Sequence, residues 1–303
     1  MDLASKFDSG KGTCTYQRID SKYKVNIYLG YNNDGKMSFS IIEKGRMQSI
    51  KSSKFIDVSI KKRKDGKLVL SFDLLDTIYS SLFVVFCKDL IITCEDVGKN
   101  NAISQAIARW KYWVELFGQK YSKILDISKI KGLFGELSVL DKYLIPLYGY
   151  NVAIKGWLGP LMGHKDFEVD STWYEVKTIS DNAVQLTINS LEQLDSNIDG
   201  HLVVVRINET SEANVFSSNL NKLVLEIVNK IDDSSVLNCF REKLNELGYH
   251  FTAEYEKYNY LVENIESYTV NSSFPKLTKR NIDKAICEAK YNILIPEIFK
   301  FKE

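Results

Sequence analysis

The sequence predicts an α+β fold, in which a β-rich N-terminal domain is followed by a domain that mixes helices and strands. Two observations support this prediction. Up to about residue 95, apolar and polar residues alternate in short runs, as in half-buried strands. From about residue 99, apolar residues recur every three or four positions, as on one face of a helix. We therefore expect a β-rich domain at 1–98, a helical connector at 99–127 and a mixed α/β domain at 128–303.

The N-terminal region is expected to form a small antiparallel sheet or partial barrel. Its strongest signal is Asp65-Gly66 between two alternating runs, a pattern typical of a β-hairpin. The basic run from Lys61 to Lys64 would form the solvated tip of this hairpin. Contact with a DNA backbone is the alternative, since affinity for phosphates comes from basic patches. The expected strands cover residues 25–29, 37–41, 54–60, 67–72, 82–86 and 90–94.

Helical spacing is prominent in the rest of the chain. Pro146 and Gly149 are expected to end the second helix, because proline disrupts a helix interior and glycine is favoured just past a helix end. Trp110 and Trp113 lie on the apolar face of the first helix and are expected to pack between the two domains. Helices are expected at 100–121, 128–143, 190–196, 217–231 and 235–247, and strands at 152–155, 184–188, 202–207 and 267–270, with a hairpin at 166–178.

Composition and charge limit the classes of function. The 303 residues include 40 basic and 39 acidic side chains, so any surface that binds nucleic acid must be a local patch. Five scattered cysteines without CxxC spacing indicate reduced thiols rather than disulfides or a zinc site. The first residues lack the apolar core of a signal peptide, and no apolar run approaches the roughly 20 residues that span a bilayer. A cytoplasmic location without a membrane partner is expected.

The most informative stretch is residues 163–178, GHKDFEVDSTWYEVKT. The DST sequence at its centre is typical of a turn, so its flanks should pair as an antiparallel hairpin. Because successive side chains alternate between faces, the apolar residues of the two strands must share one face, with Phe167 opposite Val176 and Asp166 opposite Lys177. The other face would then collect three carboxylates and a lysine: Asp166, Glu168, Glu175 and Lys177.

Carboxylates crowded on one face of a sheet repel one another. Glu168 would lie directly opposite Glu175, and like charges in that position destabilise a sheet. A divalent cation would remove the penalty, since Mg²⁺ prefers carboxylate oxygens and water. A metal-activated water beside a lysine is the chemistry of phosphodiester hydrolysis. The alternative is the solvated outer face of a surface hairpin, where Asp, Glu and Lys are ordinary.

The elements around the hairpin resemble a nuclease core. The sequence GLFGEL at 132–137 places Glu136 on a helix before the hairpin, and a strand and a helix carrying Ser190 and Gln193 follow it. This order resembles the αβββαβ core of PD-(D/E)XK nucleases, the restriction-endonuclease-like fold. Further segments resemble landmarks of one PD-(D/E)XK family of bacteria and archaea, often associated with restriction and anti-phage functions. These segments are residues 76–87, 132–137, 191–194 and 274–278.

The resemblance implies a role for each matching residue. Asp166 and Glu175 would ligate a metal ion together with the backbone carbonyl of Val176. Lys177 would assist the attacking water, and Glu136 would complete the catalytic and metal-binding site. The resemblance implies Mg²⁺ as the ion, with Mn²⁺ as a substitute.

Three further residues are candidate auxiliary or substrate-binding groups. Gln193 lies three residues after Ser190, so it is either part of an S-x-x-Q capping box or a polar group of the active site. His164 would share the acidic face if the strand begins early, and a loop histidine without a role is the alternative. Lys165 stands where the family motif has proline, a common departure from the pattern.

The function implied is that of a Mg²⁺-dependent DNA endonuclease of the restriction type, acting in phage defence. A homodimer would suit double-strand cleavage, and the N-terminal domain would recognise sequence or a partner. Two alternatives remain: a catalytically silent DNA-binding or defence-complex subunit that keeps the nuclease fold, and a nuclease that acts on RNA or on DNA ends. A second basic cluster carries the same ambiguity as the hairpin tip, and consists of Lys276, Lys279 and Arg280.

Overall fold

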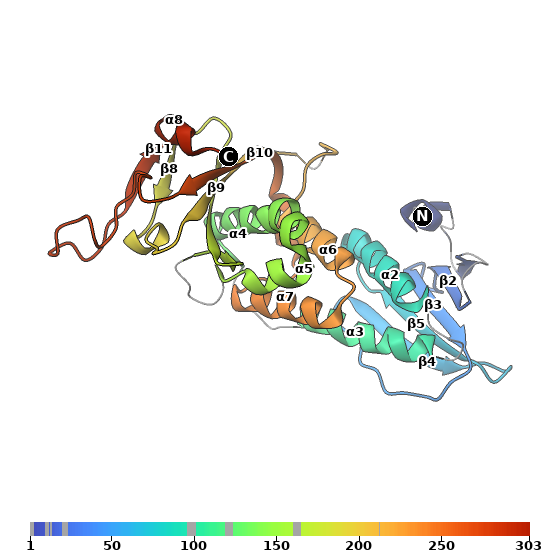
Figure 1. Ribbon diagram of the computed structural model, residues 1–303. Helices are drawn as coiled ribbons and strands as arrows, with labels where there is room; N and C mark the ends of the chain where they lie inside the picture. Colours follow the sequence, from blue (N-terminus) through green and yellow to red (C-terminus); the bar gives the residue numbers. More distant parts are fainter. Residues whose placement is uncertain are drawn as a thin grey trace. The chain divides into compact units, whose positions relative to one another are not determined.

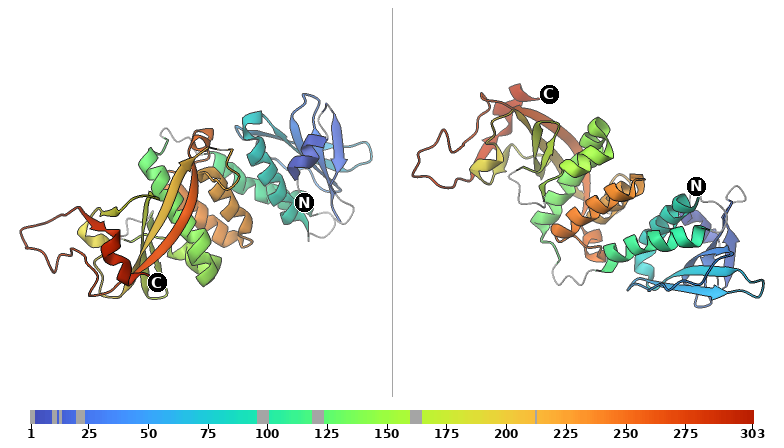
Figure 2. Two further views of the ribbon diagram at one scale, coloured as in Figure 1. Left: turned by 90° about the horizontal axis from the view of Figure 1, so that it is seen from above. Right: turned by 60° about the horizontal axis from the view of Figure 1, so that its bottom comes forward.

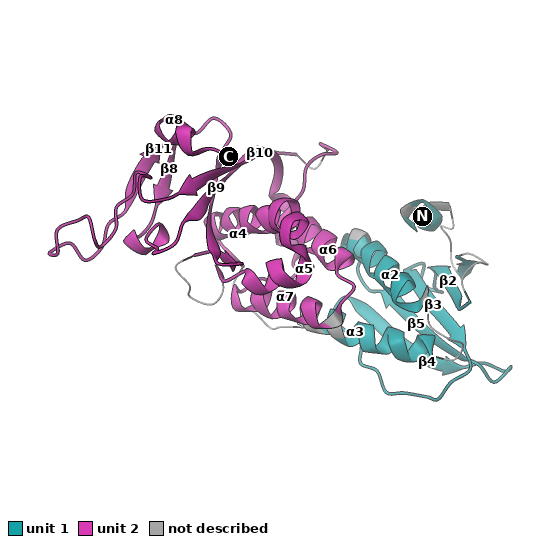
Figure 3. Ribbon diagram, viewed as in Figure 1, with its two compact units in different colours: residues 1–120 teal, residues 121–303 magenta. Residues whose placement is uncertain are grey.

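The protein forms two compact units, residues 1–120 and 121–303, in a computed structural model (Figures 1 and 3). Each unit has its own sheet and its own helices, and the two are described separately. The structure describes residues 3–9, 12, 14–19, 24–95, 101–118, 124–159, 165–211 and 213–303.

Unit 1 is built on a five-stranded antiparallel sheet with the strand order β1-β2-β3-β5-β4. The hairpin expected around Asp65-Gly66 is confirmed, and Gly66 adopts the positive φ of 79° that its turn requires. The alternating runs at 25–29 and 37–41 also pair as a hairpin. The strands are β1 (Thr15–Arg18), β2 (Asn26–Tyr31), β3 (Met37–Glu43), β4 (Ile56–Lys62) and β5 (Leu68–Leu74). The helices are α1 (Leu3–Ser9), η1 (Thr77–Tyr79), α2 (Ser80–Glu95) and α3 (Ala102–Gly118).

The prediction of two strands at 82–86 and 90–94 was wrong, because this segment is the single helix α2. Its fully buried positions include Phe83, Phe86 and Leu90, which recur at helical spacing. A continuous apolar run fits a buried strand and a buried helix equally well, so packing decided between them. No helix in the described ranges is both long enough and apolar enough to cross a membrane.

The two tryptophans of α3 belong to the core of unit 1. The ring of Trp110 packs edge-on against Phe72 and Phe86, and Trp113 packs edge-on against Phe86. Trp113 also donates a hydrogen bond of 2.7 Å to the buried carboxylate of Asp89. The expectation that both tryptophans would pack between domains is therefore corrected.

Unit 2 contains a four-stranded mixed sheet with the order β10-β9-β7-β6 and a separate two-stranded sheet, β11-β8. Strands β9 and β10 are the longest and run side by side (Figure 2). The strands are β6 (Phe167–Val169), β7 (Thr172–Ser180), β8 (Gln185–Ile188), β9 (Gly200–Thr210), β10 (Asn259–Val270) and β11 (Tyr291–Leu294).

The helices of unit 2 complete an α+β fold, as expected. With α5, α7 and the β8–β11 sheet set aside, the order α4-β6-β7-β9-α6-β10 follows an αβββαβ pattern, but α6 takes the place of the helix that we expected to carry Ser190 and Gln193. The helices are α4 (Ile127–Val139), the π-helical turn η2 (Leu140–Leu144), α5 (Ile145–Gly156), η4 (Leu191–Gln193), α6 (Leu220–Lys230), α7 (Ser234–Glu246), η5 (Ala253–Lys257), α8 (Ile295–Ile298) and η6 (Phe299–Phe301).

Two predictions about the helices of unit 2 were wrong. The chain stays helical through Pro146, because the proline lies in the first turn of α5, where its missing N–H group is not needed. Gly149, with φ at 76° and ψ at 164°, leaves helical geometry and ends the first helical run, but a second run follows it within α5, so the strand expected at 152–155 is helix. The helix expected at 190–196 is reduced to the single 3-10 turn η4.

The four-stranded sheet separates two cores. One face carries Tyr174, Val176 and Val203 and packs against helices including α4 and α6 (Figure 1). The opposite face carries Trp173 and Leu202 and packs against the β8–β11 sheet and α8. Since neighbouring residues of β7 lie on opposite faces, polar residues between the apolar ones can reach the second face without disturbing the first core.

Candidate active site

The hairpin that carries the acidic motif is tighter than expected. Asp170 and Ser171 both adopt positive φ, 45° and 66°, as the central residues of a two-residue hairpin turn do. Phe167 therefore pairs with Tyr174 and not with Val176, which corrects the predicted register by two residues. A shift of two leaves every side chain on its predicted face, because the side-chain period of a strand is also two.

The corrected register separates Glu168 from the other acidic residues. Glu168 lies opposite Trp173 and is exposed, so the expected repulsion between Glu168 and Glu175 does not arise. Asp166 instead occupies the position beside Glu175, since its backbone amide donates to the carbonyl of Tyr174 at 3.1 Å. The acidic pair on this face is therefore Asp166 and Glu175.

Asp166 is held by its backbone and by its side chain. Its carbonyl accepts from the amides of Leu158 and Gly159, at 2.7 and 3.2 Å. Its Oδ2 atom accepts a 2.7 Å hydrogen bond from the backbone N–H of Val176. The carboxylate is thus fixed across the hairpin through Oδ2, and its Oδ1 atom is not held by this hydrogen bond.

Lys177 links the hairpin to the turn that follows β8. Its Nζ atom lies 2.7 Å from Glu175 Oε1 and 3.0 Å from Gln193 Oε1. The same Gln193 oxygen accepts a 2.7 Å hydrogen bond from the backbone N–H of Asn189. Ser190 makes no side-chain capping bond in η4. Gln193 therefore makes contacts of both kinds considered for it, one to a backbone amide before η4 and one to Lys177.

Glu136 approaches the hairpin from α4. Its Oε2 atom accepts a 2.8 Å hydrogen bond from Nε1 of the buried Trp157. Gly135 makes the approach possible, because a Cβ atom at this position would lie 1.7 Å from Thr178 Oγ1 on β7. Sequence reasoning did not single out Trp157. Because a buried tryptophan needs a hydrogen-bond partner for its indole N–H, Trp157 could have been expected to contact a polar side chain.

The three carboxyl groups share one electrostatic environment. Burial and then the charge of Asp166 raise the pKa of Glu175 to about 8, against the opposing effect of Lys177. Burial also raises the pKa of Asp166, against the hydrogen bond from Val176. For Glu136, burial and then Asp166 raise the pKa well above its usual value. Negative charge is therefore costly here unless a cation compensates.

The donor atoms suit a hard divalent cation. Asp166 and Glu175 offer carboxylate oxygens, the ligands that Mg²⁺ prefers, and the backbone carbonyl of Val176 follows Glu175 directly in the chain. Across the described ranges, no three His, Cys, Asp or Glu side chains already stand together as a metal-binding cluster. In the present arrangement Glu136 is engaged with Trp157 and Glu175 with Lys177.

These residues line one pocket of about 470 Å³. One part of its lining comes from α4, which carries Lys131, and another from β8 and the turn after it. Lys131 also pairs with Glu209 at 2.5 Å. The pocket brings together Glu136, Asp166, Glu175, Val176, Lys177, Asn189 and Gln193.

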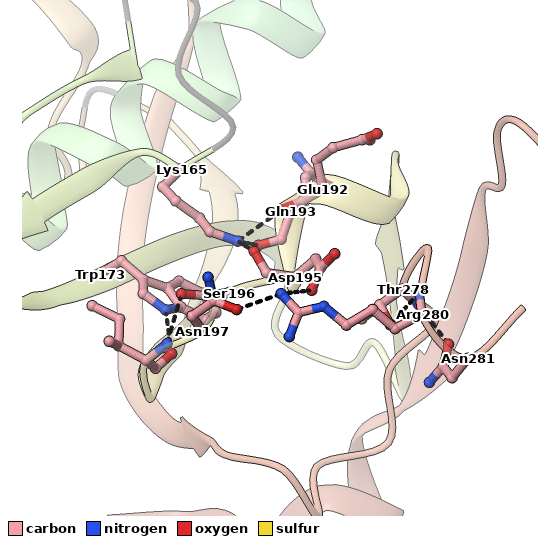
Figure 4. A network of polar contacts seen from close by, with 11 residues as sticks. Lys165, Trp173, Glu192, Gln193, Asp195, Ser196, Asn197, Thr278, Arg280 and Asn281 are labelled. Atoms are coloured by element: carbon pink, nitrogen blue, oxygen red, sulfur yellow. Dashed lines mark hydrogen bonds and ion pairs between the residues drawn. The ribbon is translucent and has the colours of Figure 1, made fainter.

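Lys165, a candidate auxiliary residue, lies next to this pocket but is not one of its lining residues. Its side chain is only 7% exposed, and Nζ donates to the backbone carbonyls of Glu192, Gln193 and Asp195 (Figure 4). The ammonium also lies 4.0 Å from the ring centre of Trp173. Burial lowers the pKa of Lys165 to about 8. His164, also a candidate, lies outside the described residues.

The basic cluster near residue 280 contacts the same segment from the other side. Lys279 pairs with Glu192 at 2.8 Å, and Arg280 pairs with Asp195 at 3.6 Å. Arg280 also donates to Asn197 Oδ1 at 2.6 Å (Figure 4). The segment that presents Gln193 is therefore held by Lys165 from within and by these exposed ion pairs from outside.

Comparisons with known proteins give one match. Residues 6–295 match the family model described as "Putative PD-(D/E)XK family member, (DUF4420)". No similar protein was found among the curated proteins, and no similar structure among the solved ones. The match spans both units.

Proposed function

The chain belongs to the PD-(D/E)XK family that residues 6–295 match, and on that premise we propose that it is a divalent-metal-dependent DNA endonuclease of the restriction type, acting in phage defence. The observation that carries the proposal is the meeting of Asp166, Glu175 and Lys177 in one pocket. Two carboxylates with raised pKa values beside an ammonium group fit a site for a metal ion and a phosphodiester.

Each residue has a proposed role that follows from its contacts. Asp166, fixed through Oδ2 by Val176, and Glu175 hold Mg²⁺ or Mn²⁺, with the Val176 carbonyl as a third ligand. When bound, the metal ion lowers the pKa of a water molecule and neutralises charge on the phosphoryl group. Glu136 contributes its Oε1 atom, since Oε2 is bound to Trp157.

Lys177 is proposed to position and stabilise the attacking oxygen. An ammonium group has three donor hydrogens, and two are directed at Glu175 and Gln193. The third remains for a water molecule or for a phosphate oxygen. Gln193 keeps the amine in this place, because its own oxygen is tied to the Asn189 amide.

The proposal is tested by incubating the purified protein with supercoiled plasmid, linear duplex DNA and RNA, each with Mg²⁺, Mn²⁺ or EDTA. We expect metal-dependent nicking or linearisation of the plasmid. Cleavage of RNA alone, or of linear ends alone, would replace the proposed substrate. DNA binding without cleavage under any metal would support a catalytically silent subunit instead.

Lys177→Ala should abolish cleavage while the chain still folds. The matched control is Lys142→Ala, which removes an exposed lysine of the same unit from η2. Circular dichroism and thermal melting establish that both variants fold. Metal-dependent cleavage by Lys177→Ala at the wild-type rate would refute the catalytic assignment.

A further inference from the structure

We propose that one end of the five-stranded sheet of unit 1 is a binding surface for the phosphate backbone of duplex DNA. This surface, the basic sheet end, lies in unit 1, whereas the candidate active site lies in unit 2. The choice of duplex DNA as the partner rests on the proposed function. The cluster of positive charge that defines the surface does not.

The strand register brings two basic segments to the same end of the sheet. In the ladder, Leu68 at the start of β5 pairs with Glu43 at the end of β3 and with Lys62 at the end of β4. The residues that follow Glu43 therefore lie beside the β4–β5 hairpin tip. A Cβ atom on Gly45 would be 3.5 Å from Leu68 Cδ1, which agrees with this placement.

Strands β1 and β2 add two more cations at this end. Asn26, the first residue of β2, pairs with Ile42, next to the end of β3, and Lys24 precedes it. Arg18, the last residue of β1, pairs with Tyr28 and continues the same row. All members of the basic sheet end are exposed except Lys67, which is half-buried. They are Arg18, Lys24, Lys44, Arg46, Lys61, Lys62, Arg63, Lys64 and Lys67.

Few acidic groups oppose this charge. Of the acidic residues described on these segments, Glu43 accepts hydrogen bonds from the backbone amides of Ala102 and Ile103 at the start of α3. Asp65 pairs with Arg63 at 3.5 Å. A chain with a formal net charge of only +1 therefore concentrates positive charge at one place.

The opposite end of the sheet carries both signs of charge. It has Asp34 and Lys36 in the β2–β3 turn, Lys54 and Asp57 around the start of β4, and Asp73 near the end of β5. Charge at the opposite end is therefore mixed. The excess of cations at the basic sheet end is what favours a polyanionic partner there.

The dimensions suit a duplex. Five adjacent strand ends at about 4.8 Å span roughly 20 Å, a length over which duplex DNA carries on the order of ten phosphates. Exposed lysine and arginine side chains on several strand ends contact phosphates at little desolvation cost. Such contacts position a protein on DNA without reading its sequence.

The test measures binding in the absence of divalent metal, so that cleavage plays no part. Fluorescence anisotropy of a labelled 30-base-pair duplex is recorded in EDTA at several salt concentrations. The test variant is Lys61→Gln, Lys62→Gln, Arg63→Gln and Lys64→Gln combined. The control removes the same charge from exposed lysines elsewhere in unit 1. It combines Lys51→Gln, Lys54→Gln, Lys88→Gln and Lys111→Gln.

We expect the test variant to bind the duplex at least about tenfold more weakly at low salt, and to lose up to about 3 to 4 units from the slope of log K against log salt. The control should stay within about twofold of wild type. If the fourfold variant does not fold, Lys44→Gln with Arg46→Gln, on a different strand end, should lower the slope by about 2. Equal weakening of test and control variants would overturn the proposal.

Other outcomes separate this inference from the proposed function. Weaker binding by the test variant, with no cleavage by wild type under any metal, would retain the surface and reject the nuclease. Cleavage by wild type with unchanged binding by the test variant would do the reverse. Wild-type binding to vesicles containing phosphatidylserine, without binding to the duplex, would overturn the surface in favour of a membrane.

Discussion

The candidate pocket of unit 2 and the basic sheet end of unit 1 are both charged, but their charged groups differ in burial and in hydrogen bonding. In the pocket, Glu175 is 1% exposed, and Asp166 Oδ2, Glu175 Oε1 and Gln193 Oε1 each accept a hydrogen bond of 2.7 to 3.0 Å. At the basic sheet end, eight of nine cations are exposed and project from separate strand ends. Interactions in the pocket are therefore strong and coupled, and those at the sheet end are weak, additive and screened by salt.

The largest effect in this comparison is expected at Asp166, and Glu168 of the same hairpin serves as its control. Asp166→Asn keeps the shape of the side chain but removes charge beside Glu175, so we expect cleavage to fall by at least about 100-fold. Glu168→Gln, two residues away and exposed, should stay within about twofold of wild type. Single-turnover cleavage of a plasmid measures both. Equal losses would mean that the acidic face acts as a whole.

A smaller effect is expected at Lys165, which we propose as a positioning residue. Lys165→Met keeps the chain length over Trp173 but leaves three backbone carbonyls without their donor. We expect kcat to fall about tenfold with KM little changed, since a misplaced Gln193 weakens the hold on Lys177.

The coupling between Lys165 and Gln193 can be measured with a double-mutant cycle. If Lys165 acts through Gln193, Lys165→Met should cause no further loss of kcat in a Gln193→Ala background. Fully additive losses would contradict the positioning role. A fall in thermal stability alone, with unchanged kcat, would contradict it as well.

The pH dependence of stability tests the buried carboxyl groups. Glu175 has an ordinary pKa of 4.5 when unfolded and about 8 when folded, so between these values only the folded chain keeps the proton. Its contribution to stability is therefore present below pH 4.5 and is lost as pH rises towards 8. Glu175→Gln should melt higher than metal-free wild type at pH 8, by at least about 2 °C, and should show less difference at pH 5.

Adding a divalent metal ion tests the ionisation of Glu175 in a second way, again through the melting temperature. If Asp166 and Glu175 hold the cation, Mg²⁺ should raise the melting temperature of wild type more at pH 8 than at pH 5, because the ligands must be ionised. Glu175→Gln should lose most of this rise. A wild-type melting temperature unaffected by Mg²⁺ or Mn²⁺ at both pH values would argue against a metal site here.

The smallest effect is expected from single changes at the basic sheet end. Lys62→Gln should weaken duplex binding only about two- to threefold, with a change of about 1 in the salt slope. Lys88→Gln, on α2, is the matched exposed control. A loss of 100-fold from Lys62→Gln would mean a specific contact rather than a distributed surface.

Most of the fold could be predicted where the pattern was periodic. The hairpins of unit 1 and helices α3, α6 and α7 follow from alternation and helical spacing. The segment 80–95 was wrongly assigned to two strands, because a continuous apolar run has no period that separates strand from helix. Pro146 was wrongly expected to end a helix, because the effect of a proline depends on whether it lies in the first turn or in the interior of the helix.

The candidate site divides in the same way. The sequence by itself placed Asp166, Glu175 and Lys177 on one face, because the side-chain period of a strand is two and survives a shift of two residues in register. Only the tertiary structure decided the rest. The positive φ angles of Asp170 and Ser171 set the register that removed Glu168 from the site. Packing of distant elements brought Glu136 and Gln193 to Asp166 and Lys177, which no local pattern can specify.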